Sequence, residues 1–299
     1  MMSNNIEALI AKRTEQVEKS LLTLASKADF TGILDVAKYS LMSGGKRLRP
    51  FIVLEAYRLF SGSDYLDVAL PVASALEMIH TYSLIHDDLP CMDNDDYRRG
   101  KLTSHKVYGE AKALLAGDTL LTYAFEVLSN AEGISDKAKI NCIKALSKYA
   151  GYSGMAGGQM IDLESQVNIK NMSELIKMHS MKTSALIICA LEMGYYLACD
   201  EVDLSIVSDL DKVGYNIGVA FQIVDDILDK ISESKVLGKE IGSDEKNGKT
   251  TTLTYLDIKE AKSLVNSLSS EAIELMKKYT SSYDSPLVQL ITYLIDRKK

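Results

Sequence analysis

The stretch EMIHTYSLIHDDLPCMD (residues 77–93) joins an apolar helical pattern to a cluster of carboxylates. Asp87 and Asp88 follow an apolar run, so we expect them at the end of a buried helix. Pro90 lacks a backbone N–H and should end or kink that helix. The chain can then turn and bring Asp93 back toward Asp87. Three convergent carboxylates need a cation, and hard oxygen ligands select Mg²⁺ or Ca²⁺.

A second acidic cluster, FQIVDDILD (221–229), lies inside an apolar run. Asp225 and Asp229 are four residues apart and project from one helical face, one turn apart. Either cluster alone could be a solvated acidic helix end. Two such clusters, each embedded in an apolar helix, favour a binding site. If the two helices face each other, they form a carboxylate-walled site open at one end.

Basic residues supply the complementary charge in GGKRLRP (44–50) and in RRGK (98–101). Glycines let a phosphate approach the backbone closely, and arginine binds phosphate oxygens in bidentate fashion. Taken singly, each run is more often a solvated basic turn. Alternating acidic and basic clusters are what Mg²⁺–diphosphate binding requires.

The rest of the chain predicts an all-α fold in a single domain, 1–299. Apolar residues recur at helical spacing, and no segment alternates at period two, so we expect no strands. The expected helices are 5–27, 32–43, 50–61, 68–89, 106–130, 135–152, 173–199, 203–232, 257–278 and 284–297. The polar segment 232–252 is either a solvated loop or a mobile flap carrying cations.

Composition excludes several classes of protein. The net charge of -7 argues against a general binder of nucleic acid or anionic membranes. The four cysteines form no CxxC pair, which argues against a zinc site or a disulfide framework and favours a cytoplasmic setting. Residues 1–14 lack the apolar core of a signal peptide. The apolar stretch 185–198 is too short to span a bilayer.

These motifs resemble the trans-polyprenyl (isoprenyl) diphosphate synthase family, whose bacterial farnesyl diphosphate synthases are the most similar type. The matching segments are GGKRLRP (44–50), EMIHTYSLIHDDLPCMDNDDYRRGKLTSH (77–105), GGQMIDL (157–163), KTSALI (182–187), FQIVDDILD (221–229) and the Lys-bearing loop 238–252. The resemblance implies antiparallel helices around a central cavity, a homodimer, and three Mg²⁺ ions per active site. It implies condensation of isopentenyl diphosphate with dimethylallyl or geranyl diphosphate, with release of pyrophosphate.

The resemblance also implies roles for individual residues. The implied metal ligands are Asp87, Asp88, Asp93, Asp225, Asp226 and Asp229. The implied isopentenyl diphosphate ligands are Gly45, Lys46, Arg49, His80 and Arg99. The implied allylic diphosphate ligands are Arg98, Lys182, Lys239 and Lys249. Lys182, Thr183 and Gln222 are the implied catalytic residues, because their polar groups would lie near the developing carbocation.

Product length depends on the helix before Asp87. Ser83 lies one turn below Asp87 on the same face, whereas ideal helix phase points Tyr82 away from Asp87. In the family, an aromatic residue at the position of Tyr82 accompanies a C15 product, so we predict farnesyl diphosphate. The alternative is geranylgeranyl diphosphate, of C20. One departure is Leu102, where the family usually has proline, and we expect it to loosen the turn after Arg99.

The remaining histidines have structural explanations. We expect His86 to pack or hydrogen-bond at a helix end, His105 to cap a helix start, and His179 to lie on a helix surface. The Met-rich segment 155–193 predicts core packing. Two rival classes are a terpene cyclase and a non-catalytic prenyltransferase subunit. The intact GGKRLRP segment and the two intact aspartate motifs argue against both.

Overall fold

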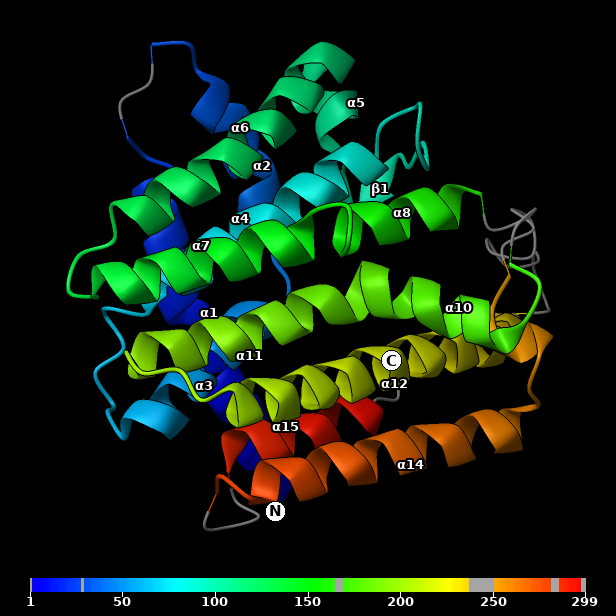
Figure 1. The fold of residues 1–299 in the computed structure, drawn as a ribbon. Helices are drawn as coiled ribbons and strands as arrows, with labels where there is room; N and C mark the ends of the chain where they lie inside the picture. Colours follow the sequence, from blue (N-terminus) through cyan, green and yellow to red (C-terminus); the bar gives the residue numbers. More distant parts are fainter. Residues whose placement is uncertain (1, 28–29, 165–168, 237–249, 281–284, 297–299) are drawn as a thin grey trace. The chain divides into compact units, whose positions relative to one another are not determined.

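The computed structural model describes residues 2–27, 30–164, 169–236, 250–280 and 285–296, without the side chains of 2–5 and 232–236. The chain divides into two compact units. Unit 1 comprises Met1–Leu146 and Ala190–Val202, and unit 2 comprises Ser147–Cys189 and Asp203–Lys299. Figure 1 shows helices throughout both units. The all-α prediction is confirmed.

Unit 1 is organised around helix α4 (Leu70–Asp87). Every residue from Val72 to Ile79 is buried, which explains why this helix has no polar face. Helices α1, α2, α3 and α6 pack against α4. The bounds of the other helices here are α1 (Met2–Leu24), α2 (Ile33–Leu41), α3 (Leu48–Ser61), α5 (Ser104–Tyr108) and α6 (Glu110–Ser129).

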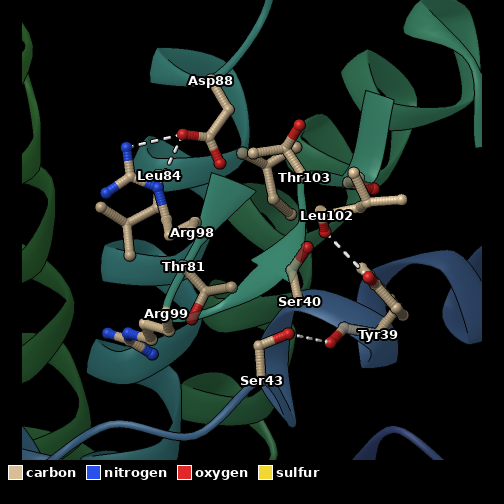
Figure 2. A pocket seen from close by; sticks show the side chains of 12 residues that line it. Tyr39, Ser40, Ser43, Thr81, Leu84, Asp88, Arg98, Arg99, Leu102 and Thr103 are labelled. Carbon is tan, nitrogen blue, oxygen red and sulfur yellow. Dashed lines mark hydrogen bonds and ion pairs between the residues drawn. The ribbon is translucent and has the colours of Figure 1, made fainter. Parts of the chain in front are cut away.

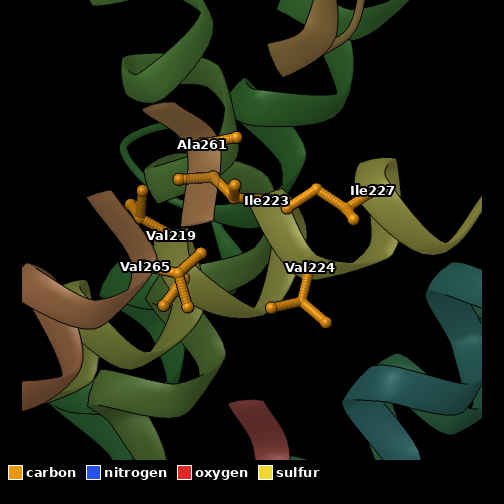
Figure 3. Packing of buried hydrophobic residues seen from close by; sticks show 7 residues of the cluster. Val219, Ile223, Val224, Ile227, Ala261 and Val265 are labelled. Carbon is orange, nitrogen blue, oxygen red and sulfur yellow. The ribbon is translucent and has the colours of Figure 1, made fainter. Parts of the chain in front are cut away.

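Unit 2 is organised around the long helix α12 (Leu204–Val236), which packs against α14 (Ile258–Lys277). Figure 3 shows the apolar contact in which Val219, Ile223 and Ile227 of α12 meet Ala261 and Val265 of α14. The other elements are α8 (Met155–Leu163), α10 (Met172–His179), the π-helix η1 (Ser180–Ser184), the 3₁₀ turn η2 (Thr252–Thr254) and α15 (Pro286–Ile295). Helices α7 (Asp136–Ala150) and α11 (Ala185–Ala198) contain residues of both units.

The helix boundaries differ from the prediction where the backbone has special geometry. Gly109, with φ of 87°, divides the expected helix 106–130 into α5 and α6. The expected helix 173–199 is interrupted by the π-helix at Ser180–Ser184. Helix α8 was not predicted, because its short MAGGQMIDL segment contains two glycines.

A short hairpin corrects the expectation of no strands. Strands β1 (Tyr97–Arg98) and β2 (Lys101–Leu102) pair antiparallel, with Tyr97 opposite Leu102. Arg99 and Gly100 both have positive φ, 53° and 76°, as a type I′ hairpin turn requires. Strands of two residues are too short to show an alternating pattern. The hairpin forms with Leu102 paired to Tyr97, and the expected loosening of the turn stays a prediction.

Two further features bear on the chemistry available to the chain. All four cysteines fall in the described part of the chain, and each is a free thiol. None of the described helices combines the length and the apolar character needed to cross a membrane.

Candidate active site

The first aspartate motif begins where helix α4 ends. Asp87 is the last residue of α4, and the Leu89 N–H donates to the His86 carbonyl at 3.1 Å as the helix closes. The Asp93 N–H then donates to the Asp87 carbonyl at 2.8 Å. The predicted turn after Pro90 is therefore confirmed. It brings the backbone of Asp93 next to that of Asp87, with Asp87 half-buried and Asp93 exposed.

The middle aspartate of this motif is bound to an arginine. Arg98 Nε donates to Asp88 Oδ1 at 2.6 Å, as Figure 2 shows. Burial raises the pKa of Asp88, although the bond to Arg98 opposes that shift. Burial lowers the pKa of Arg98, but the bond to Asp88 and the charges of Asp88, Asp95 and Asp87 together outweigh it, so the net shift is upward. The Asp88 carboxylate and the Arg98 guanidinium thus form an ion pair within unit 1.

A small cavity lies beside this ion pair. It measures about 20 Å³ and is lined by residues that include Thr81, Arg99 and Ser104. The hydroxyl of Ser104 is buried and has no hydrogen-bond partner in the described part of the chain. A cavity of this size admits roughly one water molecule.

Three of the predicted isopentenyl ligands converge in unit 1. Arg49 Nη1 lies 3.4 Å from His80 Nε2. Arg99 donates to the Gly44 carbonyl, and a Cβ at Gly45 would lie 2.7 Å from Arg99 Nη1. Glycine is favoured at position 45 by its φ of 127°, which other residues rarely adopt, and its missing side chain also leaves room for the Arg99 guanidinium.

The pKa values of both arginines in this cluster are lowered. Burial is the main cause for Arg49 and for Arg99, the charge of Glu77 opposes the shift at each, and neighbouring arginines add to it. Burial and the adjacent arginines, Arg49 first among them, hold the pKa of His80 well below its usual value. Partly desolvated cations of this kind provide a strong site for an anion such as a diphosphate. Lys46 lies exposed in the same loop.

The second aspartate motif lies within α12 of unit 2. Its middle residue, Asp226, is buried and accepts the Thr252 N–H at 2.7 Å. Gln222 Nε2 donates to Asp226 Oδ1 at 3.4 Å, and the Thr183 hydroxyl donates to Gln222 Oε1 at 3.3 Å. The structure thus brings the predicted residues Thr183, Gln222 and Asp226 into one hydrogen-bonded chain. Asp225 is half-buried and Asp229 is exposed.

Lys182 lies in the π-helix η1, next to Thr183. Its ammonium donates to Asp162 Oδ2 at 2.6 Å. A Cβ at Gly158 would lie 2.3 Å from the Lys182 backbone nitrogen, so this glycine permits α8 to pack against η1. Single π-turns inside helices are frequent at functional sites. Here the π-turn carries both Lys182 and Thr183.

The outer aspartates fit magnesium by their donor chemistry. Among the described side chains, no three His, Cys, Asp or Glu groups form a ready-made metal cluster. Each motif instead offers two accessible carboxylates, Asp87 with Asp93 and Asp225 with Asp229. Mg²⁺ is commonly held by one or two carboxylates together with water and substrate phosphates. The carboxylates of each motif match that requirement.

The residue expected to limit product length lies close to the first motif. Tyr82 is half-buried, and its ring packs edge-on against His86 with centroids 5.7 Å apart. Burial, followed by the charge of Asp87, raises the pKa of Tyr82. Ser83 is half-buried, and its hydroxyl donates to the His80 carbonyl at 2.9 Å.

The predictions for the other histidines have different outcomes. His86 Nε2 lies 3.0 Å from the Leu114 carbonyl, which confirms the expected bond at a helix end. The prediction that His105 caps a helix start is wrong, because His105 lies inside α5 and Thr103 is the N-cap residue. The surface prediction for His179 is wrong: this residue is 5% exposed, and burial lowers its pKa. Its helix, α10, packs against α8, η1 and α12, which covers the imidazole.

Two residues that contact the predicted site were not predicted from the sequence, and two predicted lysines lie outside the described residues. Asp162 and Thr252 bind predicted site residues, but the sequence alone did not single them out. The prediction of core packing for the Met-rich segment is confirmed for Met155, Met178 and Met193, which are buried, and is wrong for Met160, which is 58% exposed. Lys239 and Lys249 lie outside the described residues, as does most of the predicted flap 232–252.

Comparison with known proteins assigns the class. The chain matches the Polyprenyl synthetase family over residues 31–285. It is 42% identical to a farnesyl diphosphate synthase of Micrococcus luteus (89% of each chain covered) and 40% identical to a geranylgeranyl diphosphate synthase of Cyanophora paradoxa (98% and 97%). A solved FPP/GFPP synthase structure from Zymomonas mobilis aligns with a TM-score of 0.85 at 32% identity (99% and 100%).

The protein is therefore a prenyltransferase. More particularly, the chain belongs to the Polyprenyl synthetase family and is a trans-prenyl diphosphate synthase.

Proposed function

We propose that this protein condenses isopentenyl diphosphate head to tail with dimethylallyl and then geranyl diphosphate, giving farnesyl diphosphate and pyrophosphate. The main support is the convergence of Arg49, His80 and Arg99 at the Gly44–Gly45 turn. A synthase needs a metal-free anion site for its second substrate, and a cluster of cations provides one.

Isopentenyl diphosphate would bind this cluster. Gly45 admits the diphosphate close to the backbone, while Lys46, Arg49 and Arg99 bind its oxygens. His80 is neutral near physiological pH, because burial and the adjacent arginines lower its pKa. It would therefore donate one neutral N–H bond to the diphosphate and hold no further positive charge.

The allylic diphosphate would bind at the aspartate motifs. Asp87, Asp93, Asp225 and Asp229 would hold Mg²⁺, which when bound neutralises the negative charge of the leaving diphosphate. Arg98, Lys182, Lys239 and Lys249 would add cations from the protein. Asp88 and Asp226 would contribute by orienting Arg98 and Gln222, to which they are bonded.

The residues of the π-helix would act on the developing carbocation. The Thr183 and Gln222 side chains already share a hydrogen bond, so their oxygens have fixed directions. Asp162 similarly orients the Lys182 ammonium. Preorganised dipoles of this kind stabilise charge without reorganisation at the moment of reaction. The allylic C–O bond breaks and releases pyrophosphate, the isopentenyl double bond attacks the allylic carbon, and the proton that is then lost passes to the released pyrophosphate.

Tyr82 supports the choice of farnesyl diphosphate as product. Its ring is half-buried and lies one turn before His86, and the charge of Asp87 helps to raise the pKa of its hydroxyl. A rigid ring there would stop a growing chain at C15. The relatives include synthases named for both C15 and C20 products, so geranylgeranyl diphosphate is the second candidate.

We also propose that both compact units belong to one functional domain and that the protein is a homodimer. The family match at 31–285 runs through both units and supports the first point. Leu114 and Leu115 of α6 are 45% and 53% exposed, which supports an interface on unit 1.

Pyrophosphate release tests the reaction type. With Mg²⁺, we expect release only when isopentenyl diphosphate and geranyl diphosphate are both present, and none after chelation with EDTA. Release from geranyl diphosphate alone would indicate a cyclase instead. No release under any condition would indicate a non-catalytic subunit.

A further inference from the structure

Arg47 lies between two predicted substrate ligands, Lys46 and Arg49, yet its side chain points into the protein. The guanidinium is 0% exposed and its Nη1 donates to Glu77 Oε1 at 2.7 Å. Nη2 donates to the Leu41 carbonyl at the end of α2 and lies 3.4 Å from Glu18 Oε1 of α1. One side chain therefore joins the loop to α1, α2 and α4.

The backbone of Arg47 is strained, and the hydrogen bonds of its side chain hold the residue in that conformation. Its φ of 47° and ψ of 42° place it in the left-handed region, which is unfavourable for a non-glycine residue. Arg47 is also the N-cap of α3, and its carbonyl accepts the Phe51 N–H at 2.9 Å. The direction in which α3 leaves the loop, and hence the position of Arg49, depends on this conformation.

Glu77 is the carboxylate that could compete with substrate for the basic cluster. It is 2% exposed and lies three residues before His80 on the same face of α4. Its charge is felt by both Arg49 and Arg99. The Arg47 guanidinium is the ion-pair partner of the Glu77 carboxylate. Neither Arg49 nor Arg99 forms an ion pair within the described part of the chain.

We propose that Arg47 is a positioning residue for the isopentenyl site. Its buried ion pair with Glu77 fixes the left-handed turn that aims Lys46 and Arg49, and it keeps Glu77 from pairing with Arg49. The role rests on the proposed function of this cluster as the isopentenyl diphosphate site. It acts through neighbouring residues and without contact with substrate.

The test is steady-state kinetics of Arg47→Lys with each substrate varied in turn. Lysine keeps the charge but cannot reach Glu77 and the Leu41 carbonyl with one planar fork. We expect KM for isopentenyl diphosphate to rise about tenfold, with less than about a twofold change in KM for geranyl diphosphate. An unchanged KM for isopentenyl diphosphate in a folded variant would overturn the proposal.

The chain offers a matched control. Arg13 Nε and Glu55 Oε1 also form a buried pair of 2.7 Å, which joins α1 to α3 and includes no residue of the 44–47 loop. Arg13→Lys should lower the melting temperature and leave both KM values within about twofold of wild type. If it raises the isopentenyl KM as much as Arg47→Lys does, the effect is general destabilisation and the proposal fails.

A double variant keeps the proposal testable if Arg47→Lys fails to fold. Arg47→Met with Glu77→Met removes both buried charges, which proteins often tolerate without loss of stability. We expect the fold to be retained and the isopentenyl KM to stay raised. A wild-type KM in this variant would overturn the positioning role. Absence of product from the wild-type enzyme would instead refute the proposed function, so the two failures are distinguishable.

Discussion

The two aspartate motifs reach a similar arrangement from different backbones. The first straddles a helix end: α4 stops at Asp87, and a turn carries Asp93 back until its N–H meets the Asp87 carbonyl. The second stays within the continuous helix α12, where Asp225 and Asp229 are one turn apart. In both motifs, the middle aspartate is buried and bonded to protein, while the last aspartate is exposed.

The difference in burial indicates that the middle aspartate of each motif has a different role from the first and last. Asp88 is bound to Arg98, and Asp226 to the Thr252 N–H and Gln222. Their carboxylates are already used to hold neighbouring groups. The first and last aspartates of each motif are more exposed than the middle one, and we assign magnesium to them on that ground. The motifs differ in what the middle residue holds: a charged side chain in unit 1 and a buried backbone amide in unit 2.

The largest expected effect comes from removing the first aspartate of either motif. Asp87→Ala and Asp225→Ala should each lower kcat/KM by about a thousandfold or more, because stabilisation of the leaving diphosphate is lost. Turnover assays with a far-ultraviolet dichroism control measure this. A folded variant with near-normal activity would refute the assignment of that motif, and unequal losses would show which motif dominates.

The next effect is on product length and should belong to the first motif alone. Tyr82→Ala removes the ring that packs beside His86 and should extend the product from C15 to C20. Tyr152→Ala is the control, because Tyr152 is 90% exposed in unit 2 and should leave the product unchanged. Chromatography of the dephosphorylated products gives the answer. A C15 product from Tyr82→Ala would exclude this residue as the floor.

A third prediction separates the two middle aspartates by their cost to stability. Asp226→Ala leaves the buried Thr252 N–H without its acceptor, so we expect a loss of about 1–3 kcal/mol in urea unfolding. Asp226→Asn keeps an oxygen acceptor and should lose less. Asp88→Ala should cost about 1 kcal/mol or less, because the Arg98 side chain left behind is 31% exposed and keeps Asp95 as a partner. Equal losses at the two positions would contradict the contrast.

The smallest effect is the pH dependence of stability from His80. Burial, Arg49 and Arg99 hold the pKa of His80 well below 6.5 in the folded chain, so the unfolded state binds the proton first. Stability should therefore fall as pH drops through about 6.5, with a slope that approaches at most about 1.4 kcal/mol per pH unit. Urea unfolding of wild type and His80→Gln between pH 7 and 5.5 measures the difference. Identical slopes would contradict it.

His179 supplies the contrast in unit 2. Burial lowers its pKa too, but the charges of Asp226 and Asp162 oppose that shift. His179→Gln should therefore change the slope of stability against pH less than His80→Gln does. The same unfolding series tests this comparison, and a larger effect at His179 would reverse it.

Sequence reasoning succeeded where local chemistry decides the structure. Helical periodicity predicted α4 and α12, and the missing N–H of Pro90 predicted the turn to Asp93. It failed where tertiary contacts decide. His179 has ordinary helical surroundings in sequence, and only the packing of α8 and α12 buries it. The inward direction of Arg47 depends on Glu77, thirty residues away, and no local pattern reveals it.

The most direct test of the account is the product formed by the purified protein with Mg²⁺, isopentenyl diphosphate and dimethylallyl diphosphate. Chromatography after dephosphorylation gives the chain length. We expect farnesol as the main final product, with geraniol as an intermediate that disappears at longer times. A final C20 alcohol would contradict the product assignment, and the absence of any elongated alcohol would contradict the central claim.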